Sequence, residues 1–271
     1  MKSSSIIPQR LPLERRSVAR LLAPLEMAAE NSVHFISKSL GQFENGGSTY
    51  SLPRFIYLGP KGGGDTIRIG ILAAIHGDEP EGALALTRFV EILENNREIS
   101  KGYALFLYPV CNPTGFEDNT SHSRAGADLD REFWKDTSEP EVRYLQSEIW
   151  MHAFDGIITL RSSDSADGLY GHAAGVVLSE HLLEPALKEA EQFLPRSERR
   201  AIDGLTAEHG IIRDDHSGVL KSPLGLRRPP FEIVLQSPQS APLHRQAEAF
   251  SAALQTILRE YRYLIAIGQN I

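Results

Sequence analysis

The chain is poor in the features that mark secreted, membrane-bound or nucleic-acid-binding proteins. It has one cysteine, Cys111, among 271 residues. An intramolecular disulfide and a cysteine-based zinc cluster are therefore excluded, and we predict a small buried apolar residue at this position. No lysine- or arginine-rich run occurs, and the net charge is −7. Nucleic acid and anionic membranes are consequently poor partners.

Long apolar runs are also missing. The first twenty residues contain four arginines but no apolar segment of the signal-peptide type, and no run approaches membrane-spanning length. Internal repeats and low-complexity segments are absent as well. With 41% hydrophobic and 23% charged residues, the composition is that of an ordinary globular protein. We therefore predict a soluble, cytoplasmic protein that folds as a single domain over residues 1–271.

Apolar periodicity predicts strands that alternate with helices. Strands are expected at residues 33–39, 50–58, 67–75, 103–110, 157–160, 175–178 and 231–235. Helices are expected at residues 13–29, 80–95, 139–154, 180–193 and 241–264. Residues 1–30 form an N-terminal extension in this interpretation, and residues 194–230 form an insertion of loops and short β pieces. The alternation predicts a three-layer α/β/α sandwich around one mixed sheet.

The stretch from Ile71 to Gly82 joins a predicted strand to a predicted helix. Pro80 stands near the helix start, where its missing N–H would have no partner anyway. His76 and Glu79 thus follow the carboxyl end of a strand, where open α/β sheets bind ligands. An imidazole and a carboxylate three residues apart can form half of a zinc site. From the spacing alone, a turn histidine and a helix-capping glutamate are the commoner explanation.

Two further motifs make the pattern more specific. Residues 112–116 read Asn-Pro-Thr-Gly-Phe, Arg124 follows, and residues 128–133 read Asp-Leu-Asp-Arg-Glu-Phe. Together with the His-Gly-Asp-Glu run at 76–79, they resemble the metallocarboxypeptidase superfamily. Within it, the chain is most similar to the succinylglutamate desuccinylase and aspartoacylase branch of zinc deacylases, over residues 68–259. The resemblance implies a zinc-carboxypeptidase-like α/β fold and zinc-dependent hydrolysis of an amide bond.

The resemblance also implies a role for each matching residue. His76 and Glu79 match the first two zinc ligands. Arg124 matches the catalytic arginine that polarises the scissile carbonyl, and Arg131 matches the arginine that pairs with the substrate carboxylate. A forked guanidinium suits that pairing, although an arginine in a polar loop is often only a solvated surface group. The implied ligand is a small anionic amino-acid derivative or a peptide.

Three positions depart from the family pattern. Asp130 stands where the family has an asparagine among its substrate-binding residues, and its carboxylate would repel a substrate carboxylate. Arg161 falls on the third zinc-ligand position, and a guanidinium has no lone pair to offer a metal. Gln236 falls on the catalytic glutamate that activates the zinc-bound water, and an amide cannot take that proton. Whether the chain is an enzyme is therefore uncertain from its sequence.

These departures predict that zinc is absent or weakly bound. Two protein ligands fall short of the three that a catalytic zinc normally has. Holding a guanidinium about 4 Å from a dication costs roughly 8 kcal/mol at an effective dielectric of about 20. We expect Arg161 to fill the vacated metal position and to form a salt bridge with Glu79. With the uncharged Gln236, that pair would leave a neutral pocket floor.

Two functions therefore remain open from the sequence. One is a metal-free relative that keeps Arg124 and Arg131 to bind an anion and has little or no hydrolase activity. The other is an active zinc-dependent amide hydrolase with a non-standard third ligand. Asp164 or His172 could supply that ligand if the strand-end alignment is displaced by a few residues. The metal content of the purified protein separates the two functions.

Overall fold

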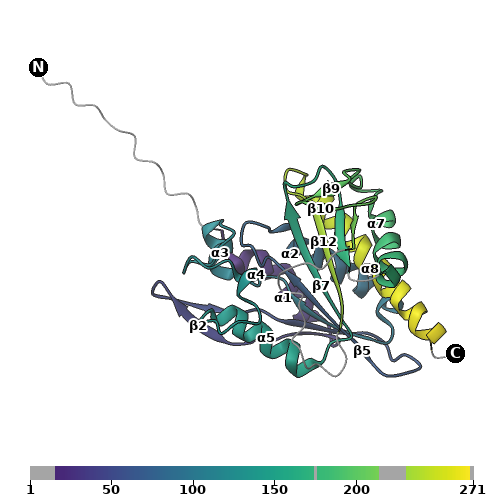
Figure 1. The fold of residues 1–271 in the computed structure, drawn as a ribbon. Helices are drawn as coiled ribbons and strands as arrows, with labels where there is room; N and C mark the ends of the chain where they lie inside the picture. The colour runs from purple at the N-terminus through teal and green to yellow at the C-terminus, as the bar shows by residue number, and fades with distance from the viewer. Residues whose placement is uncertain (1–15, 174–175, 214–229, 269–271) are drawn as a thin grey trace, which may run out of the picture.

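The computed structural model describes residues 16–173, 176–213 and 230–268. Eight strands form its central sheet (Figure 1). From one edge to the other they are β1 (Phe35–Ser37), β4 (Phe55–Leu58), β6 (Tyr103–Tyr108), β5 (Ile67–Ala73), β7 (Gly156–Ser163), β12 (Phe231–Pro238), β8 (Tyr170–Ala173) and β11 (Ile211–Ile212). Two small hairpins stand apart from this sheet, β2 (Gln42–Asn45) with β3 (Ser48–Ser51) and β9 (Ala201–Ile202) with β10 (Leu205–Thr206).

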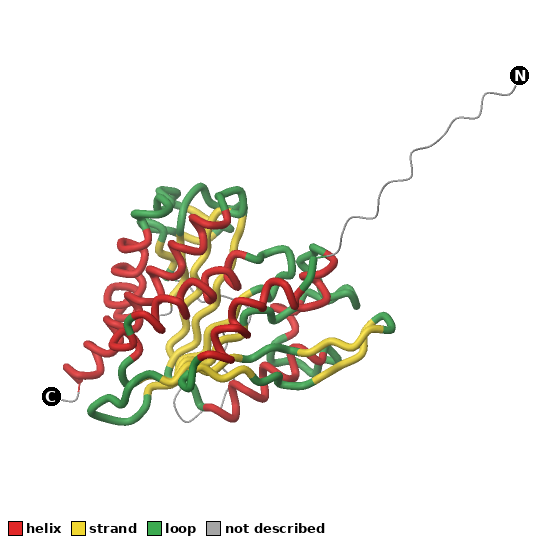
Figure 2. The backbone as a smooth tube through the Cα atoms, turned by 180° about the vertical axis from the view of Figure 1, so that it is seen from behind, coloured by secondary structure: helices red, strands yellow, loops and turns green. Residues whose placement is uncertain are grey.

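Helices cover both faces of the sheet, as Figure 2 shows from behind. The helical segments are α1 (Val18–Asn31), α2 (Glu81–Asn95), the 3-10 turn η1 (Arg97–Ser100), α3 (Pro113–Asp118), α4 (Leu129–Glu132), α5 (Pro140–His152), α6 (Val176–Leu178), the π-helical turn η2 (Ser179–Leu183), α7 (Glu184–Ala190) and α8 (Leu243–Gly268). No helix in the described part of the chain is both long and apolar enough to cross a membrane.

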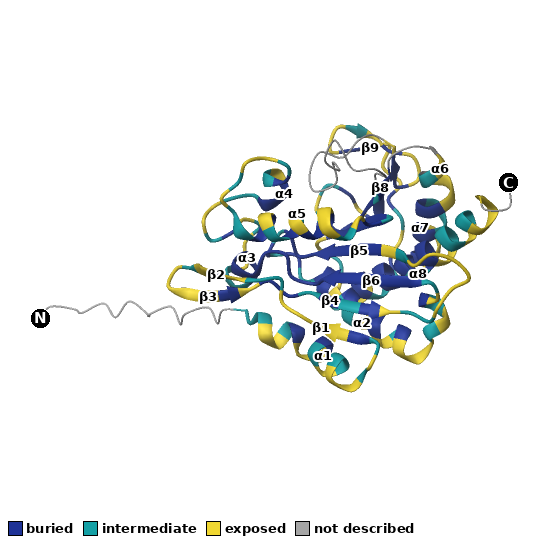
Figure 3. Cartoon of the chain, turned by 90° about the horizontal axis from the view of Figure 1, so that it is seen from below, coloured by how far each residue is buried: buried dark blue, intermediate teal, exposed yellow. Residues whose placement is uncertain are grey.

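The central strands are buried on both faces because nearly all their side chains are apolar (Figure 3). Alternate side chains enter different cores. In β6, Leu105 and Leu107 pack with residues of α1, α2, α7 and α8, whereas Phe106 packs with residues of α5. The same alternation runs through β5, β7 and β12. The predicted three-layer α/β/α architecture with a mixed sheet is therefore confirmed.

The strand order creates one favourable place for a ligand site. Strands β6, β5, β7 and β12 run parallel, so their carboxyl ends lie at one edge of the sheet. The chain leaves β5 for β6 on one side, and later enters β7 on the other side of β5. The strand order therefore reverses at β5. Ligands of open α/β sheets bind outside the strand ends at such a switch point, and His76 follows the end of β5 by three residues.

Several elements differ from the sequence prediction. The predicted strand at 175–178 is wrong: residues 176–178 form α6, and the strand of this region is β8, residues 170–173. Residue 175 itself lies outside the described residues. A short apolar run does not distinguish a strand from a helix, which explains the error. The predicted strand at 50–58 is two strands, because Pro53 has no N–H for the ladder.

One polar segment carries more structure than predicted: residues 111–136, predicted as a loop, contain α3 and α4. The segment 194–230 contains the short strands β9, β10 and β11 before residue 214, in line with the short β pieces predicted there. Its residues 214–229 lie outside the described residues. The N-terminal helix begins at Val18, where the hydroxyl of Ser17 accepts a hydrogen bond from the Arg20 N–H. The α1 helix packs against α2 through the larger core, in which Leu22 and Leu25 are buried.

Candidate functional site

The backbone turns sharply after β5 to present the site. Ala74 has a φ of 47°, a left-handed conformation that residues with a side chain rarely adopt. The Ala74 carbonyl accepts a hydrogen bond from the Asn112 N–H at 2.9 Å, which ties the turn to the segment that follows β6. The next residues reach the end of β7, where the Ser162 N–H donates to Glu79 Oε2 at 3.2 Å.

The two sequence motifs form one packed unit. A Cβ at Gly77 would lie 2.0 Å from the backbone carbon of Gly115 and 2.1 Å from the Phe116 nitrogen, so only glycine fits. The Asn112 side chain caps α3 by accepting the Gly115 N–H at 2.8 Å, and it donates to the Ile75 carbonyl at 3.2 Å. The Asn-Pro-Thr-Gly motif therefore supports the loop that carries His76.

Arg161 is the centre of the site. It lies on the same face of β7 as Ile157, toward α5, and is 8% exposed. Its Nε donates to Glu79 Oε2 at 3.0 Å, and its Nη1 donates to Asp130 Oδ2 at 2.9 Å. Burial lowers the pKa of Arg161, but attraction to Glu79 and Asp130 outweighs burial and raises it above its usual value. The predicted Arg161–Glu79 salt bridge is confirmed.

His76 completes the cluster. Its Nδ1 lies 2.9 Å from Glu79 Oε1, and its Nε2 lies 3.3 Å from Asp128 Oδ1. Arg161 Nη2 lies 2.8 Å from one ring nitrogen and 3.1 Å from the other. The two nitrogen lone-pair directions lie in the ring plane and diverge, so a group this close to both nitrogens stands over the ring face. Arg161 Nη2 therefore stands over the imidazole, and both ring nitrogens can donate to carboxylates.

The protonation of His76 follows from these contacts. Burial lowers the pKa of His76, the hydrogen bond to Glu79 raises it, and the charge of Arg161 lowers it. Glu79 and Asp128 prevail, so the pKa of His76 lies above its ordinary value. A protonated His76 donates to both carboxylates, and this state reduces the negative charge of the cluster.

We tested whether these residues fit the zinc ion that the fold family implies. Ligand atoms of His76, Asp78 and Glu79 lie within 4.8 Å of one another. Among the described residues, these three form the only group of potential metal ligands that converge in this way. Asp78 was overlooked in the sequence. The guanidinium of Arg161 contacts both His76 and Glu79, however, and so lies where a dication would bind them. In this arrangement the residues do not fit zinc.

The substitutes proposed for the third ligand lie outside this group. Neither Asp164 nor His172 joins the three residues whose ligand atoms converge in the described part of the chain. His172 is buried on β8, with its ring 6.1 Å from that of Tyr170. The alternative of a third ligand from Asp164 or His172 thus gains no support from the geometry.

Gln236 lies beside Arg161 in the sheet. The two residues are paired in the parallel register of β12 and β7, and both are buried. The Gln236 Oε1 accepts a hydrogen bond from the Tyr170 hydroxyl at 2.9 Å. Burial raises the pKa of Tyr170 to about 12, so this hydroxyl keeps its proton at neutral pH. Gln236 therefore takes part in an uncharged hydrogen bond.

The two arginines with predicted substrate roles lie differently. The Arg124 guanidinium forms a forked pair with Asp118 at 2.6 and 2.8 Å and also donates to the Tyr50 hydroxyl of β3. Arg131 is 81% exposed, and its Nε lies 3.1 Å from Asp128 Oδ2. Of the three residues predicted to bind substrate, Asp130 is the one that contacts Arg161. The catalytic role of Arg124 and the carboxylate-binding role of Arg131 stay predictions.

The cluster carries more negative charge than its sequence suggested. The predicted neutral floor counted Arg161, Glu79 and Gln236, but the structure adds Asp130 to the same contacts. Asp78 has a carboxylate oxygen within 4.8 Å of ligand atoms of His76 and Glu79, and Asp128 Oδ1 lies 3.3 Å from His76 Nε2. A further acidic residue, Glu81, is buried at the start of α2. Burial and, to a smaller extent, the neighbouring charges of Glu79 and Asp78 raise its pKa to about 7.

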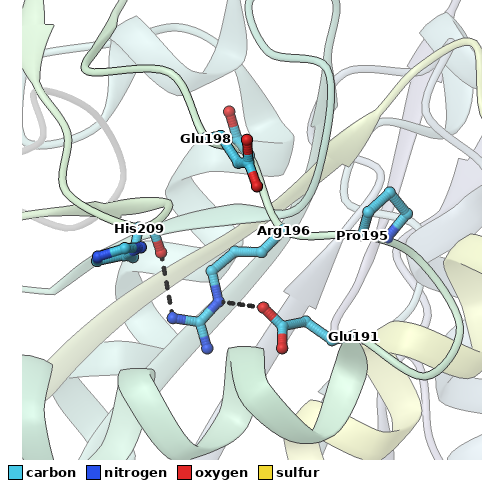
Figure 4. A pocket seen from close by; sticks show the side chains of 6 residues that line it. Glu191, Pro195, Arg196, Glu198 and His209 are labelled. Carbon is cyan, nitrogen blue, oxygen red and sulfur yellow. Dashed lines mark hydrogen bonds and ion pairs between the residues drawn. The ribbon is translucent and has the colours of Figure 1, made fainter.

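Three other hollows lie apart from this cluster. One of 350 Å³ is lined by the Arg196 side chain, which pairs with Glu191 at 2.8 Å (Figure 4). A second, of 440 Å³, lies between α1 and β3, and a third, of 580 Å³, lies between the glycines at 62–64 and the end of α8. None of the three is lined by a residue of the Arg161 cluster.

Solved structures with the same fold were found at low sequence identity. No family model and no curated protein sequence matches the chain. A candidate metallopeptidase from Shewanella amazonensis SB2B aligns with a TM-score of 0.75 and 21% identity, over 89% of this chain and 92% of that one. A metallo-carboxypeptidase from Burkholderia cenocepacia aligns with a TM-score of 0.71 and 15% identity, over 92% and 70%.

A succinylglutamate desuccinylase/aspartoacylase from Rhodobacter sphaeroides aligns with a TM-score of 0.56 and 15% identity, over 83% of this chain and 64% of that one. At these identities the likeness concerns the fold, and the activity must be argued from the residues of this chain. The chain therefore has the α/β fold of the metallocarboxypeptidases, shared with the succinylglutamate desuccinylase and aspartoacylase branch, as its motifs predicted.

Proposed function

We propose that this chain is a metal-free relative of the zinc carboxypeptidases and deacylases, which binds a small molecule or a peptide and has little or no hydrolase activity. One observation carries the proposal. Arg161 contacts Glu79 at 3.0 Å and both ring nitrogens of His76 at 2.8 and 3.1 Å, so the two matching zinc ligands are engaged by a permanent cation.

Zinc binding would require Arg161 to leave its partners. Breaking a buried ion pair by removing one partner typically costs about 3–5 kcal/mol. If Arg161 stayed in place, a dication about 4 Å away would add a repulsion of roughly 8 kcal/mol at an effective dielectric of about 20. Either route removes much of the affinity that His76, Glu79 and a third carboxylate could supply.

The proton chemistry of the family site is missing independently of the metal. The position of the water-activating glutamate is held by Gln236, whose amide has no basic lone pair at neutral pH. Its oxygen already accepts the Tyr170 hydroxyl. Hydrolysis by the family mechanism would therefore need both a different cation site and a different base, which supports a binding role.

The metal content of the purified full chain tests the proposal. After incubation with zinc chloride and removal of free ions, mass spectrometry of the protein should find far less than one zinc per chain. His76→Ala provides the matched control, because zinc bound elsewhere is unaffected by that substitution. A full equivalent of zinc that is lost in His76→Ala would refute the proposal.

A restoration variant tests the same idea in the opposite direction. Arg161→His combined with Gln236→Glu returns the third ligand and the base of the family pattern. We expect this variant to bind more zinc than the natural chain, with assays on N-succinyl and N-acetyl amino acids as the activity readout. Equal zinc binding by both proteins would show that Arg161 does not control access of the metal.

A second candidate function is an active zinc-dependent amide hydrolase. The observation in its favour is the convergence of ligand atoms from His76, Asp78 and Glu79 within 4.8 Å. In that case Asp78 would take the place of the missing third ligand, and Asp78→Asn would abolish both zinc binding and hydrolysis. Under the metal-free proposal, the same substitution leaves the already low zinc content unchanged.

A further inference from the structure

We propose that the ligand of this site carries a cationic group, a guanidinium or a primary ammonium, rather than the anionic group that the family resemblance implies. The inference rests on the proposed function, because it takes the cluster around Arg161 as a binding site that holds no zinc. Three independent observations support it: the engagement of the Arg124 fork, an unpartnered carboxylate, and a guanidinium already seated beside the cluster.

The arginine expected to act beside a ligand carboxylate is engaged elsewhere. Arg124 uses the fork of its guanidinium on Asp118, through Nε at 2.6 Å and Nη2 at 2.8 Å. Arg131 contacts Asp128 through Nε, and its side chain is 81% exposed. A ligand carboxylate would have to displace Asp118 to gain Arg124, and at Arg131 it would gain a pair exposed to solvent, which is worth little. It would also approach Asp130, whose charge repels it.

The second observation is the unpartnered carboxylate of Asp78. This side chain is partly buried, and it forms no hydrogen bond or ion pair with another side chain or backbone group in residues 16–173, 176–213 and 230–268. Glu79 and Asp130 accept from Arg161, and Asp128 contacts His76. Glu81 Oε1 also lacks a hydrogen-bond partner, but Glu81 is only 2% exposed. Asp78 is therefore the unpartnered carboxylate that a donor from outside can reach.

The third observation is a guanidinium that already lies against the same loop. The Arg16 guanidinium carbon stands 5.6 Å above the ring of Phe116, and Nη1 lies 3.5 Å from the carbonyl oxygen of Gly77, the residue between His76 and Asp78. An aromatic face and a free carbonyl oxygen form a suitable seat for such a cation. The surface beside the cluster therefore accepts guanidinium chemistry.

The same chemistry could come from two sources. One is a free small cation. The other is the chain itself, because Lys2, Arg10 and Arg15 precede Arg16 in the sequence. A basic residue on the same chain would compete as an intramolecular ligand at a high effective concentration. The experiment must therefore compare the natural chain with a full-length variant that lacks these three charges.

Calorimetric titration of the full chain at low ionic strength tests the inference. The cationic probe is agmatine, which has a guanidinium, an ammonium and no carboxylate, and the anionic probe is glutarate. We expect agmatine to bind at least tenfold more tightly than glutarate, and Asp78→Asn to weaken agmatine binding at least tenfold. The matched control is Asp65→Asn in an exposed loop before β5, which should leave agmatine binding unchanged.

The source is identified by the triple variant Lys2→Gln, Arg10→Gln and Arg15→Gln. An agmatine affinity that rises tenfold or more in this variant assigns the site to the basic residues of the chain. An unchanged affinity assigns it to a free cation. Absence of Asp78-dependent agmatine binding in both proteins would overturn the inference, as would tighter binding of glutarate.

The zinc content of the same samples keeps the two proposals apart. If the protein contains a full equivalent of zinc that depends on His76, the proposed metal-free function fails, whatever the probes do. If the protein is metal-free but prefers glutarate, only the cationic ligand class fails. If it is metal-free and prefers agmatine through Asp78, both proposals are supported.

Discussion

Replacement of Arg161 by methionine tests the central contact of the site. Methionine keeps most of the side-chain length and removes the charge. Glu79 and Asp130 would then lose charged donors at 3.0 and 2.9 Å while remaining buried. Removing one partner of a buried ion pair typically costs about 3–5 kcal/mol, and here two carboxylates lose the same partner. We therefore expect the free energy of unfolding to fall by about 4 kcal/mol.

Urea unfolding followed by circular dichroism at pH 7 measures this loss. The control is Arg259→Met, because Arg259 is 58% exposed and its one ion pair among the described residues is with the adjacent Glu260, an interaction expected to be worth less than about 1 kcal/mol. A triple variant that adds Glu79→Gln and Asp130→Asn to Arg161→Met should recover most of the loss, since neither former partner of Arg161 then keeps an uncompensated charge.

One result would refute the reasoning. If Arg161→Met lost no more stability than Arg259→Met, the guanidinium could not be a buried partner of Glu79 and Asp130. The metal position would then be open in solution, and the zinc hydrolase would become the better explanation. Failure of the triple variant to recover stability would show that packing of the arginine stem, rather than its charge, accounts for the loss.

Three further predictions concern protonation and packing. Burial raises the pKa of Glu141 to about 7 from an ordinary 4.5, so the natural chain should lose up to about 3 kcal/mol as pH rises through that window. Glu141→Gln should abolish this loss. Its urea midpoint should therefore exceed that of the natural chain at pH 8 but not at pH 4. The pKa of His76, measured by NMR, should lie above 6.5. Its stabilising contribution should be present below pH 6.5 and should fade as pH rises through the folded-state pKa. A measured pKa below 6.5 would contradict its carboxylate contacts. Gly77→Ala should cost at least about 2 kcal/mol because its Cβ meets the Gly115 backbone, whereas Gly63→Ala, which meets nothing within 4 Å, should unfold like the natural chain.

The sequence was sufficient for the fold and for the contact between Arg161 and Glu79. Both residues stand next to long apolar strands, whose pattern is unambiguous because those strands are buried on both faces. The family resemblance then put Glu79 on the second zinc-ligand position and Arg161 on the third, which predicted the salt bridge. Parallel pairing of β5 with β7 brings those strand ends together and makes the contact possible.

The polar loops were the part that sequence reasoning could not resolve. Asp130 lies in the four-residue α4, within a segment that has no apolar periodicity, so nothing placed it against Arg161. The partner of Arg124, Asp118, likewise comes from a short helix in that segment. The signal for Asp78 was present, because it stands between two candidate ligands, but the family pattern directed attention to His76 and Glu79.

The departures at 130, 161 and 236 form one electrostatic change. When Arg161 takes the place of a dication, the local positive charge falls by one, and a glutamate at 236 would leave a buried carboxylate without a partner. Glutamine removes that charge, and its oxygen is satisfied by Tyr170. Asp130 then supplies a second carboxylate, which the guanidinium engages through a separate nitrogen. An asparagine at this position would offer a weaker, uncharged acceptor. Reversal of Arg161 alone would therefore leave Asp130 without its cation.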